Sequence, residues 1–159
     1  MKPDIAARAS ALVYGEDLEV GRTYRLGAHT ITEDELIDFA STWDPQRFHV
    51  DKDAAEAGAY GGLIASGLHT LSVYQKLVVD TVFSDWHVIA GRSLREVRFL
   101  RPVRPGDTLT GTVHIHNVVL DEVRNRALTT LEAELTGHHG RPVLTATVDA
   151  YVHTRSHTR

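Results

Sequence analysis

The sequence contains no cysteine and no long hydrophobic run. Without cysteine there is no disulfide, no thiolate nucleophile and no cysteine-ligated zinc site. No stretch reaches the roughly 18 apolar residues that a membrane-spanning helix needs. The N-terminal segment MKPDIAARASALVYGED also lacks the apolar core of a signal peptide. These absences favour a cytoplasmic protein that has no membrane partner.

Positive charge is not in excess either. The chain has 17 Lys and Arg against 21 Asp and Glu, which gives a formal net charge of −4. Nucleic acids and anionic membranes bind basic surfaces, so neither is an expected partner. A chain of 159 residues can bury a full core. We expect one domain over residues 1–159, with 1–20 as an N-terminal extension that holds a loose helix over 5–13, and with 154–159 as a flexible tail.

The first third of the chain predicts one strand and two short helices. Residues 23–31 alternate in the manner of a strand. Thr32 and Glu35 have the spacing of a capping box, which starts the first helix. Asp51 is the expected N-cap of a shorter helix over residues 52–57.

Between these helices lie an acid and an imidazole, Asp44 and His49. Pro45 ends the first helix, because the residue before a proline avoids helical backbone angles. We therefore expect Asp44 just past the helix end and His49 in the loop that follows. A carboxylate and an imidazole are suited to moving protons in catalysis. The alternative interpretation is an Asp that caps a turn and a hydrogen-bonded loop His.

The remainder of the chain predicts a long helix and then a sheet. Residues 64–82 are apolar around most of the helical circumference, as in a buried helix. The strands expected after it cover residues 91–100, 108–119, 127–137 and 143–153. A strand, a helical middle and an antiparallel meander together predict an α+β fold in which the sheet wraps round the long helix.

Three segments in this order resemble one known family. Residues 44–49 (DPQRFH) are similar to an Asp-x-Asn-Pro-x-His signature, residues 61–69 (GGLIASGLH) to a Gly-rich start of a central helix, and residues 98–107 (RFLRPVRPGD) to a later strand and proline turn. The family is the MaoC-like dehydratases, which include the (R)-specific enoyl-CoA hydratases. The resemblance covers residues 20–153 and implies the hotdog fold, an antiparallel β-sheet wrapped around a long central helix.

The resemblance also implies roles for particular residues. Asp44 and His49 would be catalytic and share one water molecule, and the backbone N–H of Gly67 would stabilise an oxyanion. The alternative for Gly67 is that it only relieves crowding between helix and sheet. Further candidates for contact with the substrate are Tyr60, Leu63, Ser66, His69 and Ser72.

The implied activity is that of a hydro-lyase that hydrates a 2-enoyl thioester or dehydrates a 3-hydroxyacyl thioester, with no metal or redox cofactor. The implied substrate is carried on coenzyme A or on acyl carrier protein, and the implied assembly is a homodimer or a dimer of dimers. Arginines recur at positions 92, 95, 98, 101 and 104. One or two of them are expected to contact the phosphates of coenzyme A.

Two other functions stay open. One is an acyl-CoA thioesterase on the same fold, although thioester hydrolysis of that type does not need the pair Asp44 and His49. The other is a non-catalytic subunit that binds acyl thioesters. Trp43, where the family usually has Gly, and Gln46, where it has Asn, keep this alternative open, and Arg47 replaces the signature proline.

Overall fold

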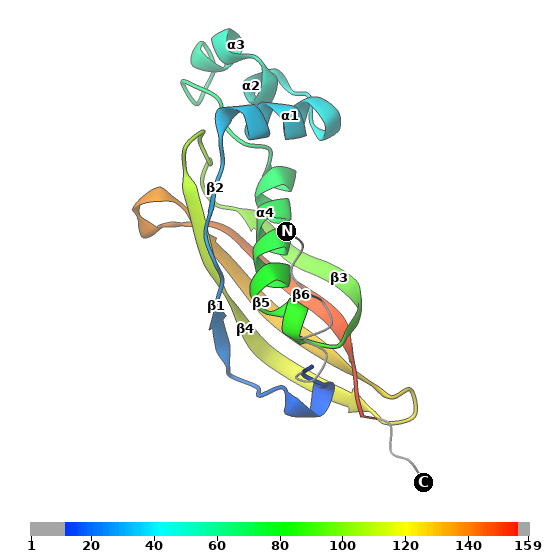
Figure 1. The fold of residues 1–159 in the computed structure, drawn as a ribbon. Coiled ribbons are helices and arrows are strands. Elements are labelled where there is room, and N and C mark those ends of the chain that lie inside the picture. Colours follow the sequence, from blue (N-terminus) through cyan, green and yellow to red (C-terminus); the bar gives the residue numbers. More distant parts are fainter. Residues whose placement is uncertain (1–11, 156–159) are drawn as a thin grey trace, which may run out of the picture.

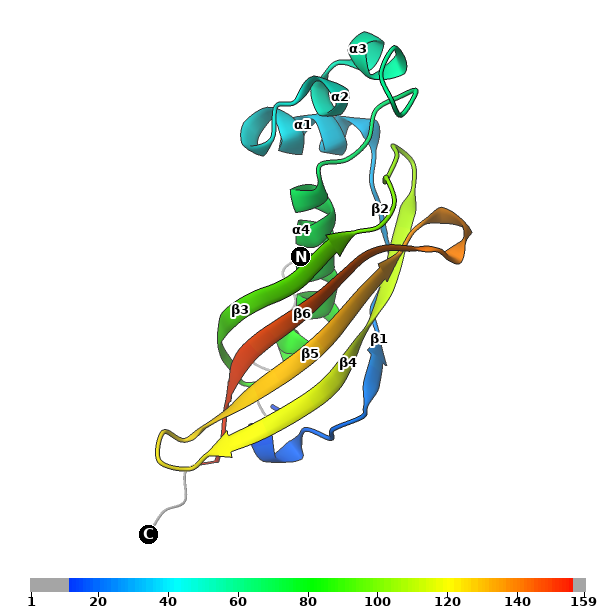
Figure 2. The same cartoon turned by 180° about the vertical axis from the view of Figure 1, so that it is seen from behind.

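A curved antiparallel sheet packs against one long helix in the computed structural model, which describes residues 12–155 (Figure 1). The strands are β1 (Thr23–Arg25), β2 (His29–Thr30), β3 (Val88–Phe99), β4 (Thr108–Asp121), β5 (Arg126–Thr136) and β6 (Pro142–His153). Their order is β1-β4-β5-β6-β3, and β2 also pairs with β4. Helix α4 (Gly67–Thr81) lies on one face, and Figure 2 shows the opposite face. The predicted α+β fold with a central helix is confirmed.

The core lies between α4 and the sheet. The buried residues that α4 contributes are His69, Thr70, Val73, Tyr74, Leu77 and Val78. Along β4, the buried side chains Leu109, Val113 and Ile115 follow the period of two that the sequence predicts. The sequence predicts that this helix is buried on all sides, and that prediction is wrong. The sheet covers only one side of α4, and Leu68 is 51% exposed.

Three short helices cover one end of α4 (Figure 1). They are α1 (Glu33–Trp43), α2 (Arg47–Val50) and α3 (Lys52–Glu56), and one-turn 3-10 helices cover Gly15–Asp17, Phe83–Asp85 and His138–Gly140. Both predicted N-caps are confirmed, since Thr32 accepts from the N–H of Glu35 and Asp51 from that of Ala54. The second half of the capping box is wrong, because the Glu35 carboxylate bonds the His29 ring instead.

The predicted first strand is divided into β1 and β2. Thr23 lies opposite His114 and Thr30 opposite Thr108, so seven steps on this strand face six on β4. An extra residue of this kind bends a strand and increases its twist.

The predicted meander is correct for β4, β5 and β6 but wrong for β3, which pairs with β6. Register shifts interrupt that pairing at three places. Such bulges curl the sheet around α4 and carry the end of β3 toward the first turn of the helix.

The described ends of the chain pack against the sheet. Val13 forms a β-bridge with Trp86, and Arg155 pairs with Asp17. Of the tail predicted over 154–159, residues 154 and 155 donate backbone hydrogen bonds to Asn125 and Glu16, and residues 156–159 lie outside the described residues. The helix expected over 5–13 lies outside the described residues except for 12 and 13. In the part of the chain described, no helix has both the length and the apolar character to span a membrane.

Candidate active site

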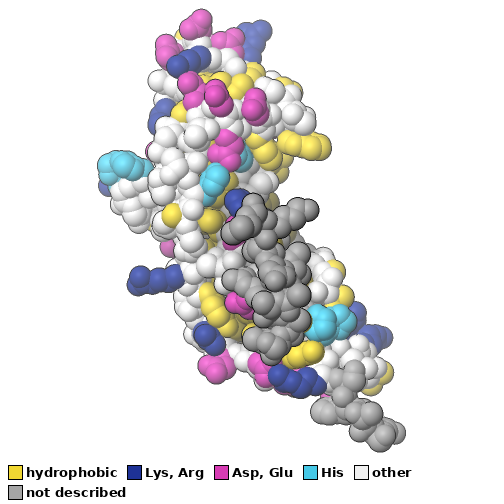
Figure 3. Space-filling model, viewed as in Figure 1, with side chains coloured by type: hydrophobic (Ala, Val, Ile, Leu, Met, Phe, Trp, Pro, Cys, Tyr) yellow, Lys and Arg dark blue, Asp and Glu magenta, His cyan; other side chains and the backbone are white. Residues whose placement is uncertain are grey.

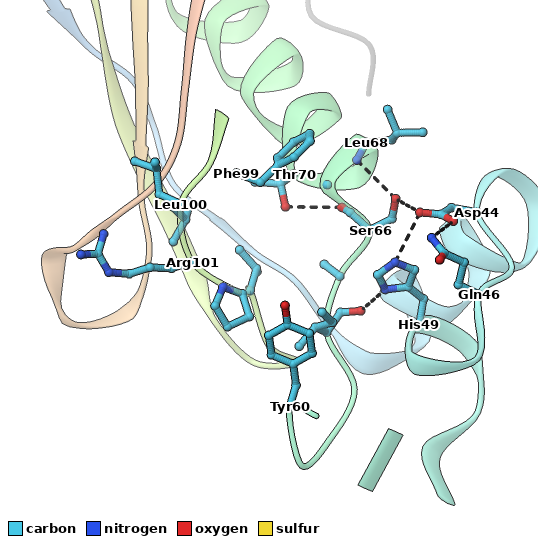
Figure 4. A pocket seen from close by; sticks show the side chains of 16 residues that line it. Asp44, Gln46, His49, Tyr60, Ser66, Leu68, Thr70, Phe99, Leu100 and Arg101 are labelled. Atoms are coloured by element: carbon cyan, nitrogen blue, oxygen red, sulfur yellow. Dashed lines mark hydrogen bonds and ion pairs between the residues drawn. The ribbon is translucent and has the colours of Figure 1, made fainter. Parts of the chain in front are cut away.

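Asp44 ends helix α1 and turns its carboxylate toward the start of α4 (Figure 4). The helix stops because Asp44 precedes Pro45, and its backbone angles, φ −155° and ψ 69°, lie outside the helical region. The N–H of Gln46 donates to the Asp44 carbonyl at 2.8 Å and closes a tight turn. The predicted place of Asp44, just past the helix end, is confirmed.

His49 lies in the one-turn helix α2, so its predicted place in a loop is wrong. A helix of four residues is too short to leave a periodic pattern in the sequence. The ring is only 4% exposed, and its Nδ1 lies 2.6 Å from the carbonyl oxygen of Ile64. Since a carbonyl oxygen only accepts, Nδ1 carries a proton. In the neutral ring Nε2 is then an acceptor, and it lies 3.3 Å from Asp44 Oδ2.

Two neutral donors hold the Asp44 carboxylate. Ser66 Oγ donates to Oδ2 at 2.7 Å, and Gln46 Nε2 donates to Oδ1 at 2.8 Å. These bonds, that from Ser66 first, lower the pKa of Asp44 because they stabilise its charged form. Gln46 thus supplies an amide to the carboxylate even though it departs from the family signature.

Gly67 is the first residue of α4, so the helix begins three residues after the predicted start at residue 64, and Gly67 lies in its first turn as expected. Ser66 is the N-cap: its hydroxyl accepts from the N–H of Leu68, and its carbonyl accepts from two further amides of the first turn. Among the described residues, no protein group accepts from the N–H of Gly67. A free amide at the positive end of a helix is available to a developing negative charge.

These groups line one cavity of about 330 Å³ (Figure 4). Its other walls come from Tyr60, from residues 64–65, and from the end of β3 with the loop after it, where Phe99, Leu100, Arg101, Pro102 and Val103 lie. Apart from Arg101, which is one of the five arginines considered for contact with coenzyme A, the sequence predicts no cavity role for residues 99–103. In the sequence analysis this segment is noted for its family resemblance. No local pattern of residues shows that this end of the sheet lies next to residues 44–49.

Of the further candidates, Tyr60 lines this cavity, and the Ser66 side chain, 0% exposed, contacts Asp44. The structure places the other three outside this cavity. Leu63 belongs to the hydrophobic core, and His69 and Ser72 line a different cavity together with Val73 and Lys76. His69, Ser72, Val73 and Lys76 are spaced three or four residues apart, so they share one side of α4. That side faces this other cavity. The Ser72 hydroxyl bonds the Leu68 carbonyl.

The fold and the site together define a class of protein. It is a hotdog domain in which a carboxylate and an imidazole line a cavity beside the first turn of the central helix. The family model for the MaoC like domain matches residues 17–137. The chain therefore belongs to the MaoC-like dehydratase family.

Individual relatives agree. The chain is 32% identical over 100 residues to the uncharacterized protein YdeM of Bacillus subtilis, covering 63% of this chain and 71% of that one. It is 30% identical over 109 residues to an (R)-specific enoyl-CoA hydratase of Rhodospirillum rubrum, covering 68% and 73%. A crystal structure of a MaoC-like dehydratase from Rhodospirillum rubrum superposes with a TM-score of 0.81 at 30% identity, covering 90% and 98%.

Ser66→Ala is expected to lower kcat roughly tenfold by loosening Asp44, and to move the acid limb of the pH profile. The hydroxyl lowers the pKa of Asp44. Without it that pKa rises, so Asp44 is protonated, and activity is lost, at a higher pH than in the wild type. The measurement is kcat/KM for an enoyl thioester across the acid range.

The matched control is Thr32→Ala. It removes the hydroxyl cap of α1, which costs about 1 kcal/mol of stability as at other N-caps, but it does not contact Asp44. The control should leave the acid limb in place. An unchanged acid limb in Ser66→Ala, with a comparable fall in thermal stability, would mean that Ser66 is only a helix cap.

Proposed function

We propose that this protein adds water to 2-enoyl thioesters and, in reverse, dehydrates 3-hydroxyacyl thioesters carried on coenzyme A or acyl carrier protein. The observation that carries the proposal is the approach of Asp44 Oδ2 and His49 Nε2 to 3.3 Å at the cavity that holds Gly67. The relative named (R)-specific enoyl-CoA hydratase supports it.

An ionised Asp44 and a neutral His49 turn two acceptors toward each other. A water molecule that donates one O–H to each would satisfy both, and they would then hold its oxygen for attack on C3 of the substrate. As the C3–O bond forms, the pair removes a proton from the water and a proton is delivered to C2. The thioester oxygen gains negative charge, which the N–H of Gly67 stabilises. Because both groups would contact the same water, neither alone is assigned the first proton.

We also propose that two copies associate along β3. This twelve-residue strand ends the sheet and pairs with β6 alone among the described strands. Its exposed apolar residues include Ile89 and Leu94. The free edge of a long strand presents unpaired backbone groups, which can pair with a second chain. Sedimentation equilibrium should give twice the monomer mass, and a monomer at micromolar concentration would contradict the dimer.

The test of the activity is the loss of enoyl-thioester absorbance with crotonyl-CoA and longer 2-enoyl-CoAs. A hydratase consumes the conjugated double bond without releasing thiol. Release of free coenzyme A from a saturated acyl-CoA would instead indicate the thioesterase. Calorimetric binding of every thioester with turnover of none would indicate the non-catalytic subunit.

A further inference from the structure

A second cavity adjoins the active-site cavity, and three arginines and two histidines are among the residues that line it. It has a volume of about 720 Å³ and is formed by Arg101, Pro102, Arg104, Asp107, His138, His139, Arg141 and Val143. We call it the arginine basin. Arg101, Pro102 and Val143 line both cavities, so the two share one wall. The two cavities are therefore direct neighbours.

Two loops build the arginine basin. Residues 100–107 connect β3 to β4, and residues 137–141 connect β5 to β6. The second connection, orange in Figure 1, projects from the end of the sheet near α1–α3, and histidine side chains gather on it in Figure 3. In Figure 4, Arg101 lies across the cavity from Asp44 and His49. The basin is thus on the far side of the cavity from the proposed water site.

One carboxylate, Asp107, lines the basin and accepts from the backbone N–H of Arg104 at 2.9 Å, but it forms no ion pair with a described arginine side chain. Arg101 donates to the carbonyl of Pro142 and Arg104 to that of Tyr60, both at 2.6 Å. Those bonds orient the two guanidinium groups but leave their charge uncompensated. Within residues 12–155, none of the basin's three arginines forms an ion pair, whereas Arg95, Arg98, Arg124, Arg126 and Arg155 each do.

We propose that the arginine basin binds the 3′-phospho-ADP end of a coenzyme A thioester while the acyl group occupies the active-site cavity. This rests on the proposed function, because it assigns the remote end of the same substrate. Guanidinium groups bind phosphate oxygens through paired, charge-assisted hydrogen bonds. The nucleotide end carries a diphosphate and a 3′-phosphate, three anionic groups for the three basin arginines that form no ion pair with a described residue. The imidazoles of His138 and His139 offer flat faces on which adenine can stack.

The basin favours coenzyme A over acyl carrier protein for a reason of charge and shape. The prosthetic arm of a carrier protein brings a single phosphate into a cavity, and its other contacts lie on the surface outside. Coenzyme A brings three phosphates on one small molecule, which the concave basin can enclose. The carrier protein therefore becomes an outcome of the test.

The test is calorimetric binding of coenzyme A and of adenosine 3′,5′-bisphosphate, which lacks the pantetheine arm. The lead variant is Arg141→Gln, because the Arg141 side chain has no hydrogen bond or ion pair to another described residue. We expect both ligands to bind roughly tenfold or more weakly, the usual loss for a charged hydrogen bond. Arg124→Gln is the matched control, since Arg124 pairs with Asp121 in the turn between β4 and β5. It should bind both ligands as the wild type does.

Kinetics adds a second measurement. In the wild type, kcat/KM for crotonyl-CoA should exceed that for crotonyl-pantetheine, and Arg141→Gln should reduce this ratio roughly tenfold through KM. Unchanged binding in Arg141→Gln, or equal loss on both substrates, would overturn the proposal. Preference for crotonyl-acyl carrier protein, with loss of that preference in Arg141→Gln, would overturn it in favour of the carrier. If no thioester is turned over, the proposed function fails, but bisphosphate binding still tests the basin.

Discussion

Asp44→Asn and His49→Ala are each expected to lower kcat for enoyl-thioester hydration at least about a hundredfold, the low end for loss of acid–base catalysis. In Asp44→Asn the amide cannot take a proton, although it still fits between Ser66 and Gln46. In His49→Ala the second contact to the water is lost and the Ile64 carbonyl loses its donor. The measurement is the initial rate of absorbance loss with saturating crotonyl-CoA.

The controls separate chemistry from folding. Asp51→Asn makes the same change at the N-cap of α3, where Asn caps as well as Asp. His116→Ala removes an exposed imidazole from β4. Both should retain the wild-type rate, and all four variants should keep the wild-type circular dichroism spectrum.

A double variant tests whether the two residues act as a unit. If Asp44 and His49 hold one water, then the double variant should be little slower than the slower single variant, because the shared water is already lost. Near-normal rates in both single variants would remove the mechanism. Multiplicative losses would show that the two side chains act in separate steps.

Gly67→Val is expected to lower kcat by about a hundredfold, as for loss of an oxyanion donor. A Cβ at this position would lie 2.7 to 2.9 Å from ring atoms of Phe99, which also lines the cavity. The valine therefore displaces either the Phe99 ring or the first turn of α4, and the substrate carbonyl cannot reach the N–H. The loss should fall on kcat more than on KM, since the oxyanion develops after binding.

Gly27→Ala is the control for the loss of a glycine, because the nearest atom to its added Cβ is 3.9 Å away. A Gly67→Val/Phe99→Ala double variant, compared with Phe99→Ala alone, measures the part of the loss that comes from the clash. Recovery of rate in the double variant would assign that part to Phe99. An unchanged rate in Gly67→Val would mean that the carbonyl is bound elsewhere.

The elements of this fold are predictable from short stretches of sequence. The N-caps at Thr32 and Asp51 and the alternation along β4 depend on residues within a few positions of one another. The arrest of α1 before Pro45 is local too. Predictions from such patterns are correct here for the two N-caps, for the end of α1 and for the alternation along β4. They are wrong for the partner of β3 and for the burial of α4 on all sides, which depend on distant parts of the chain.

The same distinction between local and long-range information applies to the site. The sequence by itself determined the acid and the imidazole as candidates, the small-residue start of α4 and the family resemblance. Only the tertiary structure decided that Ser66 meets Asp44, that His69 and Ser72 face another cavity, and that Arg101 joins the active site to a basic basin. The reason is that residues 64–66 are placed by two backbone bonds, Ile64 N–H to Phe48 and Ala65 N–H to Val103. Those bonds join segments far apart in the chain, and no local pattern of residue types encodes where such segments meet.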